Sequence, residues 1–134
     1  MKNQQDTEST IKMIADYMEK GYLENIIDMF KQDPQYYQHI GTMLGDERMG
    51  VRIGTFALVE TLMDMANNNL PAAIPGIASL LSSTNVTIRG DAAHLLGIIG
   101  HENALPYLKN ALNDEHEMVR ENVNEAIDEI NRSS

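Results

Sequence analysis

The stretch Asn85-Val-Thr-Ile-Arg-Gly-Asp-Ala-Ala-His-Leu-Leu-Gly-Ile-Ile-Gly-His-Glu-Asn-Ala-Leu-Pro-Tyr-Leu108 contains the pattern that decides the fold. After its Ile-Arg pair, apolar residues recur at offsets of four, seven, eight and eleven, which is the spacing of one buried helical face. The later Leu-Pro pair suits the first helical turn, where no backbone donor is required. The stretch therefore predicts a helix, a short connection and the start of another helix.

The same pattern occurs three times along the chain. Leu44, Leu81 and Leu112 each precede a β-branched residue by seven positions and an arginine by eight. Further upstream in the second and third copies, the segments around Pro75 and Pro106 align at a separation of 31 residues. Such self-similarity is the signature of a repeat architecture. We therefore predict an all-α protein in which each unit has a first helix, a polar turn and a second helix that opens at Val/Ile-Arg.

The quoted stretch resembles the HEAT-like repeats of the bilin-lyase type. Their usual pattern runs Val-Arg, two variable residues, Ala-Ala, then Ala-Leu-Gly, Ile-Gly and a Leu-Pro that opens the next helix. The resemblance is specific in residues 70–130 and weaker in residues 34–66. It implies a right-handed α-solenoid, the α-α superhelix of the armadillo-type fold, with about three HEAT-like helical hairpins and an N-terminal helical pair. It identifies a fold family rather than a function.

We predict a single α-solenoid domain over residues 1–134. Residues 1–33 carry two apolar helical faces that do not fit the repeat frame, and we interpret them as a divergent helical cap, because terminal repeats commonly diverge. We assign repeat 1 to residues 34–66, repeat 2 to residues 70–100, and repeat 3 with the C-terminal cap to residues 102–131.

Two irregularities modify this frame. The repeat arginines are 37 residues apart between the first two units and 31 apart between the last two, so we expect a longer loop around residues 65–70. In the third unit, Asn124 and Asp128 occupy the positions of the small Ala93 and Gly97. We therefore predict that the last helix has a polar outer face where the stack stops.

Composition excludes several classes of function. The 134 residues carry 10 Lys and Arg against 20 Asp and Glu, and a net charge of -10 repels nucleic acid. There is no Cys, hence no disulfide framework and no thiolate chemistry. No apolar run approaches the length of a membrane span, and the polar N-terminus does not look like a signal peptide. We expect a cytoplasmic protein that binds neither nucleic acid nor membrane; its oligomeric state stays open.

The repeated arginines could form an anion-binding ladder. The family resemblance instead implies that each Arg pairs with an Asp of the intra-repeat turn and ties neighbouring units together. In the second unit Ser83 replaces that Asp, which leaves the partner of Arg89 open. We therefore assign a structural role to the following repeat residues: Arg52, Arg89, Arg120, Asp46 and Asp114.

Two His-Glu pairs invite comparison with iron-dependent deoxyhypusine hydroxylase, a HEAT-repeat enzyme in which such pairs bind the metal. Here the pairs are His101-Glu102 and His116-Glu117, whereas that family has them just after the Arg that opens a second helix. We therefore predict no metal site. Because the chain also lacks a Ser-His pairing and a phosphate-binding loop, we predict no cofactor and no enzymatic activity.

The second helices of such a solenoid line one concave face. Positions two, three, six and ten after each Val or Ile should point into it, and the surface they form grades from small and apolar to acidic. We predict the partner-binding residues to be Ile53, Ala57, Thr61, Asp91, His94, Ile98, Glu121, Glu125 and Glu129. Apolar contact positions bordered by charge would suit a basic or amphipathic segment of another protein. Alternatively, Ile53 and Ile98 pack against the N-terminal helices or the next repeat.

Two function classes follow. The first is a non-catalytic scaffold or adaptor that binds a partner segment on the concave face. The second, implied only by the resemblance to bilin-lyase repeats, is a lyase or chaperone-like factor for a tetrapyrrole-bearing protein. Pigment transfer to an apoprotein would distinguish the second from the first.

Overall fold

The computed structural model describes residues 4–66 and 68–133. All regular elements of this part of the chain are helical. The α-helices are α1 (Gln4–Glu19), α2 (Leu23–Gln32), α3 (Ile40–Leu44), α4 (Met49–Met63), α5 (Ile74–Ser79), α6 (Val86–Ile99), α7 (Leu105–Asn110) and α8 (Glu117–Ser133). Short 3-10 helices are η1 (Pro34–His39), η2 (Leu70–Ala73), η3 (Leu80–Ser82) and η4 (Glu102–Ala104).

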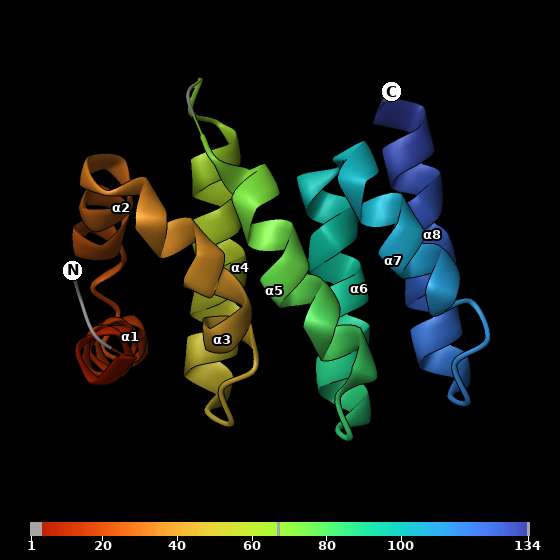
Figure 1. Ribbon diagram of the computed structural model, residues 1–134, viewed down its shortest axis with the longest axis horizontal. Helices are drawn as coiled ribbons and strands as arrows, with labels where there is room; N and C mark the ends of the chain where they lie inside the picture. Colours follow the sequence, from red (N-terminus) through yellow and green to blue (C-terminus); the bar gives the residue numbers. More distant parts are fainter. Residues whose placement is uncertain (1–3, 67, 134) are drawn as a thin grey trace.

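Three helical hairpins follow one another along the molecule (Figure 1). In each hairpin a short first helix, introduced by a 3-10 helix, precedes a longer second helix. The first helices α3, α5 and α7 lie in front in Figure 1, and the second helices α4, α6 and α8 lie behind them. The α-solenoid of helical hairpins predicted from the sequence is therefore confirmed.

The helix boundaries follow local capping chemistry. The Asp33 carboxylate accepts a hydrogen bond of 3.0 Å from the Gln35 amide, just ahead of the first hairpin. The Asn85 side chain caps α6 by accepting from the Thr87 amide at 2.9 Å. Gly100 ends α6 with φ of 71°, a left-handed conformation that glycine adopts without steric cost. Polar side chains thus mark the starts of η1 and α6, and a glycine marks the end of α6.

The apolar faces identified in the sequence form one continuous core. Both N-terminal helices contribute to it, as do all three second helices. Its buried members include Ile14, Ala15, Met18, Ile26, Phe30, Leu58, Val59, Leu62, Ala92, Leu95, Leu96, Val123, Ala126 and Ile130. The helical periodicity of the sequence therefore predicted which side of each helix is buried.

Both irregularities in the repeat frame are present in the structure. Residues 64–69 connect α4 to η2, with Asn67 outside the described residues, whereas only Gly100 and His101 separate α6 from η4. On α8, Asn124 and Asp128 are exposed. The longer loop and the polar outer face of the last helix are thus confirmed.

The N-terminal helices are arranged differently from the hairpins. In Figure 1 α1 is seen nearly end-on, whereas the axes of α2 and α4 lie closer to the plane of the picture. The chain turns between α1 and α2 at Gly21, whose φ is 83°. Met18 of α1 packs against Gly54 of α4 so closely that a Cβ at Gly54 would collide with the Met18 side chain. The absence of a side chain at Gly54 therefore lets α1 pack closely against α4.

We call the interface between two neighbouring hairpins a seam. The closest helix contact is on the first-helix face at one seam and on the second-helix face at the other. Between the first and second hairpins the first helices meet, and a Cβ on Gly41 would collide with the backbone of Gly76. Between the second and third hairpins the second helices meet, and a Cβ on Gly97 would lie 2.9 Å from the Cα of Ala126. The second-helix face is consequently more open between α4 and α6 than between α6 and α8.

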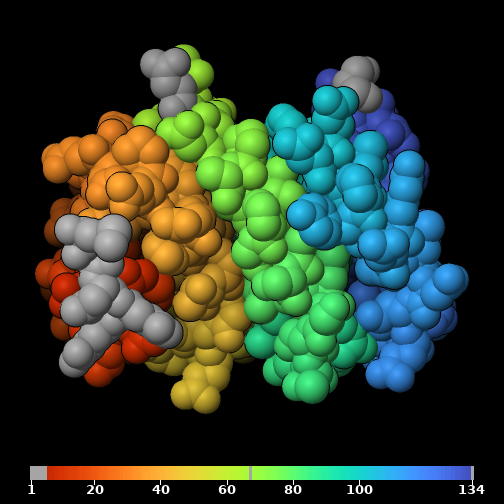
Figure 2. Space-filling view, viewed as in Figure 1, coloured from red at the N-terminus to blue at the C-terminus, as the bar shows by residue number. Residues whose placement is uncertain are grey.

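Where the first helices α5 and α7 diverge, a shallow groove opens on the face shown in Figure 2. Its lining includes Pro75 and Pro106, each in the first turn of its helix, and Tyr107. Tyr107 occupies the repeat position of Gly76, and it is 41% exposed in this groove.

We expect Gly41→Ala to lower the free energy of unfolding by about 2–3 kcal/mol, because the new methyl group meets rigid backbone rather than a movable side chain. Urea denaturation monitored by circular dichroism measures the effect. Gly50→Ala is the matched control. It adds the same methyl group in open space on α4 and should be neutral or stabilising by up to about 1 kcal/mol. Equal stabilities for the two variants would contradict the close contact between α3 and α5.

Candidate functional site

The turn inside each hairpin is built by one side-chain oxygen. Asp46, Ser83 and Asp114 each accept a hydrogen bond from the amide two residues ahead, at 2.8, 3.1 and 2.9 Å respectively. This is the local bond by which Asp and Ser stabilise turns. Ser83 therefore replaces Asp in the turn itself without loss of the bond, although it brings no negative charge.

The repeat arginines bind the same turns through the backbone. Arg52, Arg89 and Arg120 donate to the carbonyl oxygen six residues earlier, at 2.9, 2.9 and 2.7 Å. The structural role predicted for these arginines thus has a concrete form, but the partner within the hairpin is a carbonyl and not the Asp carboxylate. Because a carbonyl is present whatever the side chain, the bond survives in the hairpin that has Ser83.

The carboxylate of the turn binds the arginine of the preceding hairpin. Asp114 accepts two hydrogen bonds from Arg89, at 2.9 Å from Nε and 3.2 Å from Nη2. The two side chains are only 9% and 10% exposed. The Arg89 hydrogen bonds hold the pKa of Asp114 below its usual range. This pair answers the open question of the Arg89 partner and links the second hairpin to the third.

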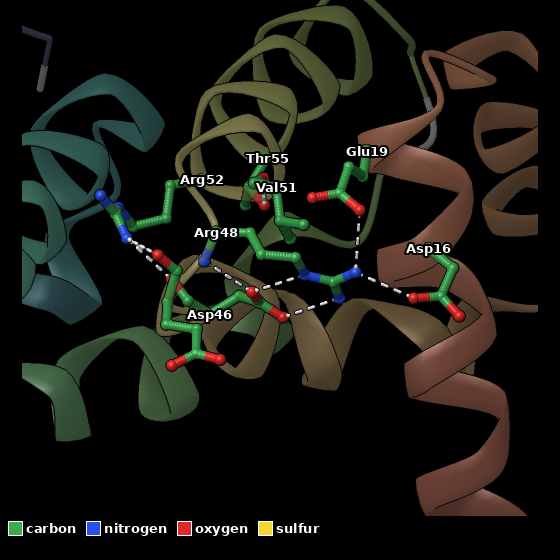
Figure 3. A network of polar contacts seen from close by, with 8 residues as sticks. Asp16, Glu19, Asp46, Arg48, Val51, Arg52 and Thr55 are labelled. Atoms are coloured by element: carbon green, nitrogen blue, oxygen red, sulfur yellow. Dashed lines mark hydrogen bonds and ion pairs between the residues drawn. The ribbon is translucent and has the colours of Figure 1, made fainter.

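A corresponding network fixes α1 to the first hairpin (Figure 3). The Asp46 carboxylate binds the Arg48 side chain at 3.0 and 3.1 Å, and those hydrogen bonds lower the pKa of Asp46. Arg48 also donates to Asp16 at 2.9 Å and to Glu19 at 3.3 Å on α1. Sequence reasoning missed Arg48, because it lies outside the repeat pattern and its partners on α1 are some thirty residues away in the chain.

We call the hydrogen-bonded ion pair of Arg89 with Asp114 a clamp, because it links two hairpins. Among the described residues, no such hydrogen-bonded ion pair links the first hairpin to the second. Arg52 would need a carboxylate at position 83, where Ser83 stands, and the nearest acid is Asp91 with its Oδ2 at 3.9 Å from Arg52 Nε. Burial raises the pKa of Asp91, while electrostatic interactions with Arg52 and His94 oppose that rise. The open α4/α6 seam therefore coincides with the one turn that lacks an Asp.

We expect Asp114→Asn to destabilise the protein by about 3 kcal/mol, because Arg89 remains buried without its anion while the amide oxygen can still accept the turn hydrogen bond. Glu115→Gln is the matched control. Glu115 lies 3.8 Å from the same arginine but is 90% exposed, so its removal should change little. Urea unfolding midpoints compare the two variants. A larger loss from the Glu115 change would refute the proposed clamp.

Ser83→Asp should stabilise the protein by about 0.5–1 kcal/mol, because it supplies a carboxylate for Arg52 at the position that Asp114 occupies for Arg89. The control Ser83→Asn keeps the turn acceptor without the charge. Urea unfolding at low salt and at high salt separates the two, because salt screens the ion pair. If both variants have the stability of the parent, the α4/α6 seam is too wide to be bridged.

A groove of about 590 Å³ lies on the second-helix face. Its walls come from the end of α4, from α6 and from α8, and it combines apolar, acidic and amide groups. The lining residues are Met63, His94, Gly97, Ile98, Asn122, Glu125, Ala126, Glu129, Arg132 and Ser133. The groove is open above the α6/α8 contact because the residues there, Gly97 and Ala126, are small. We call this feature the second-helix groove.

The second-helix groove includes four of the nine residues predicted to bind a partner. His94 and Ile98 line it from α6, and Glu125 and Glu129 line it from α8. The other five lie on the same three helices but outside the lining: Ile53, Ala57, Thr61, Asp91 and Glu121. The structure thus concentrates the predicted surface toward the C-terminal ends of the second helices.

The two isoleucines for which core packing was the alternative behave differently. Ile98 is partly buried against the core and also lines the groove. Ile53 is 62% exposed, so most of its side chain is buried neither against the N-terminal helices nor against the next repeat. It lies near the start of α4, outside the lining of the second-helix groove. The apolar surface is therefore divided into two separate places.

Sequence reasoning did not predict the roles of three members of the groove. Met63, the last residue of α4, is 39% exposed and forms part of the groove wall. Arg132 forms an ion pair with Glu129 one turn before it. The Asn122 amide donates to the Gly90 carbonyl at 3.3 Å, across the α6/α8 contact. These roles depend on how neighbouring helices meet, which the repeat pattern does not specify.

The histidines take part in local structure. His94 lies against Phe56 of α4, with the ring centroids 5.2 Å apart, and so bridges the open seam. His101 Nδ1 accepts from the Asn103 amide at 3.1 Å, and His116 Nδ1 accepts from the Met118 amide at 3.2 Å. Among the residues that the structure describes, no three His, Asp or Glu side chains are grouped to hold a metal.

These hairpins and their arginine bonds define a helical-repeat protein. A family model for HEAT repeats matches residues 23–128, from the first residue of α2 into α8, and the chain therefore belongs to the HEAT-repeat family. HEAT repeats generally mediate interactions between proteins. No curated protein matches the chain. Within residues 4–66 and 68–133, no helix combines the length and the apolar character needed to cross a membrane.

Proposed function

We propose that the protein is a non-catalytic scaffold or adaptor that binds a segment of another protein on its second-helix face. The second-helix groove carries this proposal. It is a recess with apolar and charged walls, formed by the helices that line the binding face in proteins of this architecture. The sequence also resembles bilin-lyase repeats. That resemblance supports only the alternative function given below, and it is not part of the family assignment.

The chemistry of the groove favours a partner that is both apolar and basic. Ile98 and Met63 offer apolar surface whose burial would supply affinity. Glu121, Glu125 and Glu129 follow one another at single-turn intervals on α8 and give that side a negative charge. Exposed ion pairs add little affinity, but they speed association and discriminate between partners. A basic amphipathic segment would satisfy both sets of groups.

The triple variant Glu121→Lys, Glu125→Lys and Glu129→Lys should abolish capture of natural partners from a lysate, because it reverses the charge at the groove without altering the core. Affinity capture followed by mass spectrometry gives the comparison. A matched control reverses three exposed acids elsewhere, Glu24, Glu102 and Asp128, and therefore produces the same net charge.

Partners retained by the control and lost by the groove variant would support binding on the second-helix face. Partners retained by both would assign binding to another surface. Loss of capture in both would indicate dependence on overall charge, which the proposal does not predict. Circular dichroism of each variant checks that the helices remain folded.

The alternative is a lyase or chaperone-like factor for a tetrapyrrole-bearing protein. It differs from the adaptor in an optical property. Mixing the protein with a bilin and an apoprotein acceptor should leave the absorbance spectrum unchanged if the protein is an adaptor. A shifted spectrum or transferred pigment would favour the alternative and would end the non-catalytic assignment.

A further inference from the structure

We infer that the second-helix groove selects a helical segment with a basic side chain at one end and a carboxylate two turns away. Glu125 would bind the basic group and Arg132 would bind the carboxylate. This inference rests on the proposed function, since it specifies the partner of the same groove. The opposite charges of these two residues, Glu125 and Arg132, would fix the direction in which the partner helix lies, which an acidic surface alone would not do.

The charges of the groove are ordered along α8. Glu125 comes first, and no ion pair joins it to another described residue. Glu129 and Arg132 follow, and these two pair with each other. The internal pair leaves the free negative charge at Glu125 and places the only cation of the lining at the far end. A partner with basic groups along its whole length would therefore meet repulsion from Arg132.

Arg132 can bind a second carboxylate while it keeps Glu129. Its guanidinium has five N–H donors and suits planar recognition of carboxylates. In this structure Arg132 is 67% exposed, and the Glu129 contact is recorded at one of its terminal nitrogens. The remaining donors are available to an incoming group.

The groove also has an apolar recess, formed by Ile98 of α6 and Met63 of α4. Gly97 and Ala126 line the groove as well and are in contact with each other. A partner that places its charges at Glu125 and Arg132 would bring the side chains between those charges over this recess. Apolar groups at those positions would bury the exposed part of Ile98 and Met63.

The spacing of the charges suits a helix. Glu125 and Arg132 are seven positions apart on α8, and at 1.5 Å per residue this spans roughly 10 Å. A partner helix lying along α8 would cover the same distance with residues i and i+7, and its residues i+3 and i+4 would face the apolar recess. A second copy of this chain is a poor occupant, since each copy carries a net charge of -10.

Two synthetic helical peptides test the inference. Both are alanine-based and have capped ends, a lysine, and leucines three and four positions after it. The first peptide has a glutamate seven positions after the lysine, and the second has another lysine there. Fluorescence anisotropy measures their affinity for the full chain and for the variants Arg132→Gln and Glu125→Gln.

The two peptides should respond to Arg132→Gln in opposite directions. The variant should weaken the lysine–glutamate peptide about threefold to tenfold, because a carboxylate contact is lost, and strengthen the all-lysine peptide, because a repulsion is removed. Glu125→Gln should weaken both peptides. A role for Arg132 in folding alone would move both affinities in the same direction.

Equal responses of the two peptides to Arg132→Gln, or no binding of the lysine–glutamate peptide at millimolar concentration, would overturn the inference. Neither result would overturn the proposed function. If both peptides bind and lose affinity with the groove charge reversal, but ignore Arg132, the groove binds basic segments without fixing their direction. If natural partners are captured normally by the groove variant, the proposed function itself fails.

Discussion

The ion pair between Arg89 and Asp114 is the contact on which the second-helix groove depends. It is buried and bidentate, and it joins the second helix of one hairpin to the turn of the next. A buried guanidinium without an anion is costly, so the pair permits only a narrow range of positions for α8 relative to α6. The contact of Gly97 with Ala126 lies within that range. The second-helix groove is formed where these two helices meet.

The same turn chemistry has a different consequence at each hairpin. A carbonyl binds the arginine within the hairpin, and a carboxylate, where present, binds the arginine of the hairpin before it. Asp114 has both groups, whereas Ser83 has only the first of them. Asp46 has both, but no repeat arginine precedes it, and Arg48 binds its carboxylate and extends the link to α1. One substitution in the turn thus accounts for a clamped seam beside an unclamped one.

The closed and open seams also explain where a partner could bind. Glycines bring the first helices together at one seam and the second helices together at the other. At the unclamped seam His94 spans the gap by contact with Phe56, and elsewhere on α4 Ile53 is exposed. At the clamped seam the second-helix groove is bordered by the charged side of α8. The surface for the proposed partner therefore combines exposed apolar side chains with charged ones.

The sequence by itself determined the helical hairpins, their buried faces, the longer loop and the polar outer side of α8. These features follow from local spacing, since periodicity fixes which side of a helix is apolar and Pro, Gly and Asn fix where it ends. The acids of the groove were also found in this way, because they share one face of one helix.

Only the tertiary structure decided the crossing of α1, the partner of Arg89, the alternate closing of the seams, and the roles of Met63 and Arg132. Each of these depends on distances between helices that are remote in sequence. Those distances are set by whether a contact position carries a glycine or a paired charge, and a repeat pattern leaves that unspecified.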